Sequence, residues 1–551
     1  MLFAFCLPGA AESDHAVKLA PFIVEASTGT PWRYFAVSGF EVLSRCPDGF
    51  NETYARALQH SVAARAALFP PGLLPSLPTP IKILLYCKPT ETRPVFGPGN
   101  PIDLQLAPLA DSVVGPVAIE QAAPVVVDDG DEFINCGNYS AVIAAVTDLS
   151  VDPDTDILLQ LRAPTFPAWF KAGITGPNGL FAHRIIQTTL GGHPLARFLN
   201  ASWISSDETA LLQKNPLHPR QLLPLPQLFD GSGREISPSL WDSEAALFVR
   251  WGLLAREPDG SDHRTAFLQF VDRATREPTT EAMFHECFGR GMVDVQQKLG
   301  AYLALAVKES VALSIAAPAD ESVTLRDARP DEIARIVGDW GRFAGRPART
   351  GLNGFANRDF RQDCLDRAKK LFDRTFASGE RAPLFLAAYG LCQSQLGEHA
   401  AARTALEAAT AAGVVRPRAY LELARLRLND ALPYAQQGFG DLSEPDFVAI
   451  RQLIAVARNQ MPSMQPCYQL LTRLLEHAPK TPSREDLAVL GDAVRLFPRD
   501  AAFVCKIAAL YQRCGYPSDA SALVADAKPF AESSEARSQF AGIGLPAATT
   551  P

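Results

Sequence analysis

The feature that most restricts the fold of this chain is a helical pattern that repeats in its C-terminal third. A pair of amphipathic segments begins at Pro383, and the same pattern begins again 34 residues later at Pro417. Two further units begin at Gln465 and Ala501. One such unit cannot bury its apolar face alone, so neighbouring units must stack and share a continuous core. The repeat therefore predicts an all-helical solenoid.

The spacing of small and large residues in these units resembles tetratricopeptide repeats (TPRs) over residues 383–528. Ala508 and Ala520 of the last unit fall at positions where the two helices of such a repeat pack closely. An insertion at 430–444 delays the second helix of the second unit, and residues 364–376 are expected to supply the helix before the first unit. An unrelated helical bundle is the alternative.

The region before the repeats shows a mixed pattern of strands and helices. Aromatic and β-branched residues on both sides of Ser38-Gly39 predict a hairpin, and Asn51 is expected to cap a helix that runs to about Leu68. Further strands are expected at 81–87, 123–129 and 132–136. Helical patterns follow at 178–190, 243–255, 265–274, 279–289 and 293–307, whereas residues 137–149 fit either type.

The predicted fold class is therefore an α+β N-terminal domain followed by an all-α, TPR-like solenoid. The expected divisions are an N-terminal tail at 1–30, a mixed α/β domain at 31–320, a helical-repeat domain at 321–535 and a flexible tail at 536–551.

A motif in the first domain resembles a known enzyme family. The run Pro167-Ala168-Trp169-Phe170-Lys171-Ala172-Gly173-Ile174 is similar to the P-x-W-hydrophobic-x-E-G-hydrophobic signature of gluzincin-type zinc peptidase domains. The helix at 243–255 and the pattern after Phe288-Gly289 resemble the same family. The resemblance covers about residues 130–305 and implies a peptidase-like domain, of a kind often joined to TPR arrays in exported bacterial proteins.

The residues that would bind zinc in that family are missing here. The glutamate before the glycine is the third zinc ligand of the family, and Ala172 stands at that position. An HExxH helix should supply two histidines, but residues 61–182 contain none, and His285-Glu286 has Gly289 at the i+4 position. We therefore expect a degenerate scaffold, a pseudoenzyme with no catalytic, metal-binding or cofactor-binding residues and no cofactor.

Two acidic runs resemble cation sites only in part. The run 152–156 begins like a calcium loop, but Ile157 stands where such a loop needs glycine. The run 128–132 fits an exposed turn between strands. Both are interpreted as solvated acidic turns.

Charge and hydropathy argue against a dedicated nucleic-acid binder and against a membrane-spanning helix. The formal charge is 52 − 60 = −8, which disfavours a dedicated nucleic-acid binder because such proteins need a basic face. No apolar run approaches the length of a membrane-spanning helix.

The compartment is less clearly indicated. The segment Leu2–Pro8, followed by Gly9-Ala10-Ala11, resembles the end of a signal peptide but lacks its basic start. It predicts export, periplasmic or secreted, if it is a truncated signal peptide, and a cytoplasmic protein otherwise. The ten cysteines contain no CxxC and are interpreted as unpaired core thiols.

The repeat register indicates where a partner would bind. In TPR proteins the first helix of each unit lines the concave face, which here predicts seven exposed groove residues: Leu421, Arg425, Gln469, Arg473, Glu476, Lys506 and Gln512. Three of them are cations, so the groove would favour an acidic peptide or a C-terminal carboxylate. A solvated face whose charges are paired within the solenoid is the alternative.

The sequence therefore predicts a non-catalytic protein–protein interaction scaffold. A hydrolase with unrecognised catalytic residues is the alternative, and a structural repeat protein of an envelope assembly is a third hypothesis. Carboxylates that converge in a cleft of the first domain would favour the hydrolase.

Overall fold

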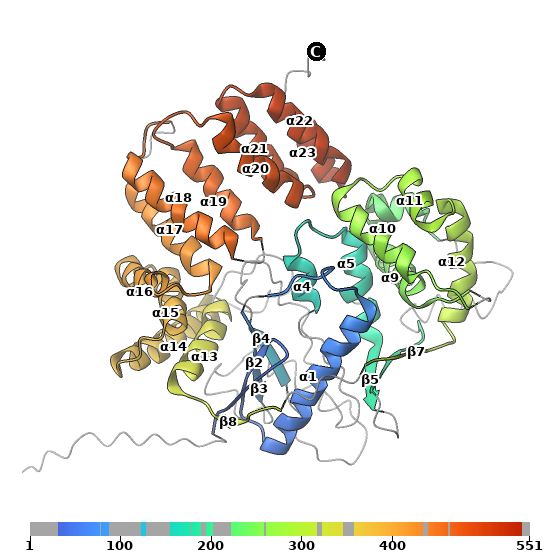
Figure 1. The fold of residues 1–551 in the computed structure, drawn as a ribbon, viewed down its shortest axis with the longest axis horizontal. Coiled ribbons are helices and arrows are strands. Elements are labelled where there is room, and N and C mark those ends of the chain that lie inside the picture. The colour runs from blue at the N-terminus through green and yellow to red at the C-terminus, as the bar shows by residue number, and fades with distance from the viewer. Residues whose placement is uncertain are drawn as a thin grey trace, which may run out of the picture.

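The computed structural model describes residues 31–77, 79–86, 123–127, 155–176, 178–188, 194–201, 222–257, 260–316, 322–344, 358–432, 439–460 and 463–542. A small sheet and a group of helices form the N-terminal part, and a curved array of helices forms the C-terminal part (Figure 1). The predicted tail 1–30, the segments 128–132, 132–136 and 137–149, and the last residues 543–551 lie outside the described residues.

The first sheet has five strands in the order β4-β3-β2-β1-β8. Their bounds are β1 Arg33–Val37, β2 Phe40–Ser44, β3 Ile81–Tyr86, β4 Ala123–Val127 and β8 Arg326–Asp327. The predicted hairpin is confirmed, because β1 and β2 pair around Ser38 and Gly39, whose φ angles of 48° and 86° suit a two-residue turn. The pair β2–β3 is parallel and the other three pairs are antiparallel. The strands predicted at 81–87 and 123–129 are also confirmed.

Helix α1, Asp48–Leu68, is the crossover that connects the parallel strands β2 and β3. The predicted helix is confirmed, but its predicted cap is wrong. The helix begins at Asp48, and the buried Asn51 side chain bonds instead to Ser44 at the end of β2 and to Cys46 just beyond it. Its Nδ2 donates to the Cys46 carbonyl oxygen at 3.0 Å, and its Oδ1 accepts a hydrogen bond from the Ser44 hydroxyl at 2.6 Å.

Two helices cover the two faces of this sheet. Successive side chains of a strand point to opposite faces, so Val42 packs with Leu58 of α1, whereas Leu43 packs with Ile336 of α13, Pro330–Ala344. The sheet is therefore the middle layer between α1 and α13.

A helical region with a second sheet follows the first sheet. The second sheet has the order β5-β6-β7, with bounds β5 Arg184–Thr188, β6 Pro194–Phe198 and β7 Val311–Ser314. The helices are α4 Thr155–Leu161, α5 Ala168–Thr175, η2 Leu180–His183, α7 Leu225–Phe229, α8 Ser232–Ile236, α9 Pro238–Leu254, α10 Arg264–Arg276, α11 Glu281–Phe288 and α12 Met292–Ala306. The four helices predicted between 243 and 307 are confirmed. The helix predicted at 178–190 is wrong, because the β-branched run at 184–188 pairs with β6.

The C-terminal part is a helical solenoid. Its helices after α13 are α14 Arg358–Ala377, α15 Pro383–Gln395, α16 His399–Ala411, α17 Pro417–Ala431, α18 Glu444–Asn459, α19 Gln465–Glu476, α20 Arg484–Leu496, α21 Ala501–Arg513, α22 Pro517–Ala527, η3 Lys528–Phe530 and α23 Ser534–Gly542. The first helices α15, α17, α19 and α21 contact one another in turn, and each packs on its own second helix. A Cβ on Gly390 would lie 2.7 Å from the Leu406 Cγ, so this small residue lets α15 and α16 approach closely. Every element described between 383 and 527 is helical, which confirms the predicted helical repeat.

Helix α13 belongs to both parts of the chain. One side of it covers the first sheet, and its other side packs on α14 and α15. Asp339 of α13 is 1% exposed and lies 3.3 Å from Lys82 of β3, 2.9 Å from Arg416 at the start of α17 and 3.5 Å from Arg342. Burial alone would raise the pKa of the Asp339 carboxyl, but Arg416, Lys82 and Arg342 outweigh burial and the pKa is lowered. A single carboxylate thus joins the sheet, α13 and the second repeat unit.

We expect Asp339→Ala to lower the free energy of unfolding by about 3–5 kcal/mol at pH 7, because it removes the carboxylate from a buried group of cations. Urea denaturation measures this change. Asp492→Ala, which breaks the exposed pair with Arg495, is the control and should cost less than about 1 kcal/mol.

The difference in free energy of unfolding between wild type and Asp339→Ala should change with pH in one direction. The pKa of Asp339 is lowered in the folded state. The stability that its ionised carboxylate adds is therefore complete above about pH 5 and is lost as the pH falls through the folded pKa. The free energies of unfolding of wild type and Asp339→Ala should therefore become more similar at acidic pH. Equal stability of the two proteins at pH 7 would contradict this role.

Candidate functional site

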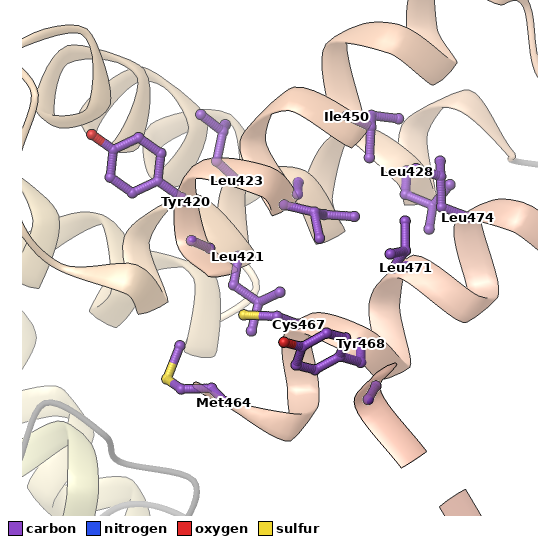
Figure 2. Packing of buried hydrophobic residues seen from close by; sticks show 14 of the residues in the cluster. Tyr420, Leu421, Leu423, Leu428, Ile450, Met464, Cys467, Tyr468, Leu471 and Leu474 are labelled. Atoms are coloured by element: carbon purple, nitrogen blue, oxygen red, sulfur yellow. The ribbon is translucent and has the colours of Figure 1, made fainter. Parts of the chain in front are cut away.

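The predicted groove residues do not all lie on an open surface. Leu421 of α17 was expected to be exposed, but it is 4% exposed and belongs to the solenoid core. Figure 2 shows its side chain directed toward Cys467 at the start of α19. An apolar side chain at this position fills the contact between two successive first helices, so Leu421 is a packing residue and that prediction is wrong.

Arg425 is exposed in part, but its charge is already paired. Its Nε lies 3.0 Å from an oxygen of the buried Glu422 carboxylate, and one of its terminal nitrogens donates to the Ser394 hydroxyl at 3.2 Å. Burial would raise the pKa of Glu422, but Arg425 and Ser394 outweigh it and the pKa is lowered. The alternative of internally paired charges therefore holds for this position.

The remaining predicted residues lie on exposed stripes of the next two first helices. Gln469 and Arg473 are exposed on α19 and Glu476 is partly exposed one turn later. On α21, Lys506 is exposed and Gln512 is partly exposed. Arg473 and Lys506 have no carboxylate within 4 Å in the described part of the chain. The predicted exposure is thus found at these positions in the last two units, and the groove itself stays a prediction.

Sequence reasoning missed one cation of this surface. Arg513 lies on the same stripe of α21 as Lys506, because residues seven apart fall on one helix face. Its guanidinium carbon lies 5.3 Å from the centre of the Phe439 ring, and no carboxylate of the described residues pairs with it. The i, i+7 spacing from Lys506 was the signal. We call Arg473, Lys506 and Arg513 the cationic face.

Five other arginines on the solenoid surface differ from the cationic face because each is paired with a carboxylate. The pairs with carboxylates are Arg403–Asp430, Arg427–Glu407, Arg451–Asp486, Arg484–Asp519 and Arg495–Asp492. Four of these five pairs join different helices. The three cations of the cationic face differ from these five arginines in that no carboxylate of the described residues pairs with them.

The C-terminal end of the solenoid contacts the N-terminal part, in a contact that we call the seam. Arg499 lies 2.9 Å from Glu532 and also donates to the carbonyl oxygens of Thr165 at 2.8 Å and Ala274 at 2.6 Å. The Glu532 carboxylate accepts from the Ala168 N–H at the start of α5, at 3.2 Å. One ion pair thus connects both sides of the seam.

Two cavities border this ion pair. The larger, of about 420 Å³, we call the seam cleft; its lining residues are Thr165, Lys171, Gln465, Phe497, Arg499, Asp500, Ala501, Ala502, Glu532, Ser533, Glu535, Ala536 and Gln539. The smaller, of about 220 Å³, has an aromatic lining of Trp169, Phe229 and Trp241. Arg499 and Glu532 line both cavities, so their ion pair forms the wall between them.

The peptidase-like motif lies on α5, and its retained residues are packing residues. Trp169 is fully buried and its ring lies 5.4 Å from that of Phe248. A Cβ on Gly173 would lie 2.4 Å from the Val249 Cγ2, so glycine is needed for α5 to contact α9. Ala172, at the family's ligand position, is partly buried. No three His, Cys, Asp or Glu side chains of the described residues are grouped so that they could hold a metal ion.

Among the described cysteines, Cys46 differs from its predicted state. Cys46 is disulfide-bonded, which corrects the expectation that all cysteines are unpaired. The thiols that are free as predicted are Cys287, Cys364, Cys392, Cys467, Cys505 and Cys514. Of the acidic run 152–156, residues 152–154 lie outside the described residues and the rest begin α4. No described helix is long and apolar enough to cross a membrane.

Comparisons with known proteins add little to this geometry. No family model matches the chain, and no curated protein matches it. The crystal structure of TTC0263, a thermophilic TPR protein of Thermus thermophilus, is similar to 33% of this chain and 92% of its own, with 17% identity and a TM-score of 0.24. A likeness this weak carries no argument, so the helical-repeat assignment rests on the stacked helix pairs themselves.

We expect Gly173→Ala to lower the free energy of unfolding by about 1–3 kcal/mol, because the added methyl overlaps α9. Gly300→Ala on the exposed side of α12 is the matched control, since a Cβ there meets nothing within 4 Å. Alanine favours a helix over glycine, so this control should gain about 0.5–1 kcal/mol. Thermal or urea unfolding measures both, and a neutral Gly173→Ala would show that α5 and α9 are not tightly packed.

Proposed function

We propose that this protein is a non-catalytic protein-interaction scaffold, in which a degenerate peptidase-like domain carries a TPR-like solenoid. The observation that carries the proposal is the cationic face. Arg473, Lys506 and Arg513 project from successive first helices, whereas Arg451 and Arg484 of the second helices are paired with carboxylates. Charges that a stable fold does not need are typical of a binding surface.

The partner that this surface suits is an acidic, extended protein segment. First helices that stack side by side expose a row of side chains along which an extended peptide can lie. Arginine and lysine form strong, charge-assisted hydrogen bonds with carboxylates. The chain itself is acidic, with a net charge of −8, so a local cationic face is selective for an anionic partner rather than part of a general positive field.

The degenerate peptidase part of the proposal is supported by the residues retained on α5. Trp169 and Gly173 serve packing, and the position that would bind metal holds Ala172. The hydrolase alternative requires two carboxylates that lie close together in a cleft and are not engaged by other side chains. In the seam cleft, Asp500 accepts from Gln465 and from the Phe503 N–H, and Glu532 is bound by Arg499.

We also propose that the protein is exported. The disulfide of Cys46 supports this localisation, because disulfides persist in oxidising compartments and are rare in the cytosol.

Reversing two charges of the cationic face tests the scaffold proposal. We expect Arg473→Glu with Lys506→Glu to bind a labelled dodecapeptide of alternating glutamate and threonine at least about tenfold more weakly than wild type at low salt, by fluorescence anisotropy. Arg484→Glu with Arg495→Glu on α20 is the matched control and should bind like wild type. Affinity that survives the reversal of Arg473 and Lys506 would contradict the proposed binding surface.

The absence of peptidase chemistry has its own test. We expect purified protein to hold no stoichiometric zinc by metal analysis, and a chelator to leave its melting temperature unchanged, since a bound metal would stabilise the native state by mass action. Ala172→Glu alone should not create peptidase activity, because two histidine ligands are still missing. Tight zinc at a 1:1 ratio would overturn this part of the proposal.

A further inference from the structure

The cationic face and the seam cleft are parts of one surface. Gln465 and Ala502 line the seam cleft at the first turns of α19 and α21. Gln469 and Arg473 follow Gln465 at intervals of four residues, and Lys506 follows Ala502 at the same interval, so each series lies on one helix face. The exposed stripe of each helix therefore starts at the cleft and leads along the cationic face.

The cleft end of this surface differs in chemistry from the cationic face. Its lining has charged side chains of both signs, two cations and three carboxylates, and therefore no surplus of positive charge. Asp500 caps α21, Glu532 pairs with Arg499, and Glu535 accepts from the Gln539 amide. Lys171 is the second cation of the lining, and small apolar side chains such as Ala501 and Ala502 line much of the rest. The Thr165 hydroxyl oxygen lies buried in this lining without a hydrogen-bond partner in the described part of the chain. This end suits an uncharged stretch of peptide.

We infer that the seam cleft receives the uncharged end of the acidic segment that lies along the cationic face. The inference rests on the proposed function and extends it, because the bound segment then contacts α5 of the peptidase-like part as well as the solenoid. From Ala502 to Arg513 the axis of α21 rises by about 16 Å at 1.5 Å per residue. An extended peptide covers that length with about five residues, and a few more reach into the cleft.

This arrangement explains why the two parts of the chain are held together at the seam. Arg499 and Glu532 fix the last helices against α5, and the pair Arg537–Glu235 adds a second contact across the seam. A segment that contacts both sides stabilises this contact. The peptidase-like part thus contributes to recognition through the wall that α5 supplies.

Filling the cleft without changing its charge tests the inference. The probe is a labelled twelve-residue peptide with six alternating glutamates followed by an uncharged end. Ala502→Trp places a large side chain at the exposed mouth of the cleft, and Ala408→Trp on α16 is the matched control on an exposed second helix. We expect Ala502→Trp to weaken binding about tenfold or more and Ala408→Trp to bind like wild type. Circular dichroism checks that both fold.

The outcomes separate this inference from the proposed function. If Lys506→Glu weakens binding and Ala502→Trp does not, the cleft inference is overturned and the scaffold proposal stands. If neither variant weakens binding, the cleft inference and the scaffold proposal are both overturned. As a second measurement, a photoreactive benzophenone at the uncharged end of the probe should crosslink to α5 or α23 in the unaltered protein. Crosslinks confined to other helices would also overturn the inference, whatever Ala502→Trp does.

Discussion

The structure depends on one buried carboxylate. Asp339 lies among Lys82, Arg342 and Arg416, and these four side chains come from the sheet, from α13 and from the start of α17. A buried charge is tolerated only when opposite charges and hydrogen bonds surround it. The sheet and the solenoid must therefore take one relative position, because any other would leave charges buried and unpaired. A second buried pair, Glu41 with Arg335, connects β2 to the same helix.

The far end of the solenoid is held in a different way. Arg499 donates to two main-chain carbonyl oxygens of the N-terminal part, and Glu532 accepts from the first N–H of α5. The solenoid is thus attached at both of its ends, at α13 and at the seam (Figure 1). An array of repeats that is free at one end can flex along its length. Attachment at both ends limits this motion and keeps the first helices of the last units in a constant relation to α5.

These attachments change the role of the N-terminal part in the proposed function. A degenerate enzyme domain could be an inert remnant, but α5 forms one wall of the seam cleft and packs tightly on α9 through Gly173. The residues kept from the peptidase-like motif hold α5 in place, and α5 in turn completes the cleft beside the cationic face. In the proposed function, this domain therefore supports a recognition surface and is not a catalytic centre.

The sequence alone was sufficient for the repeat, the hairpin and most helices, because these depend on local periodicity and turn residues such as Ser38 and Gly39. It was also sufficient for the exposed cations Arg473 and Lys506, which follow from the repeat register. It failed at β5, where pairing with β6 outweighs a helical pattern, and at Leu421, which packs against the next unit. Arg425 and Glu422 are three residues apart on α17, so the sequence left their pairing open as an alternative. The seam was out of reach, like β5 and Leu421. Each depends on which residues distant in sequence meet in space, and only tertiary packing decides that.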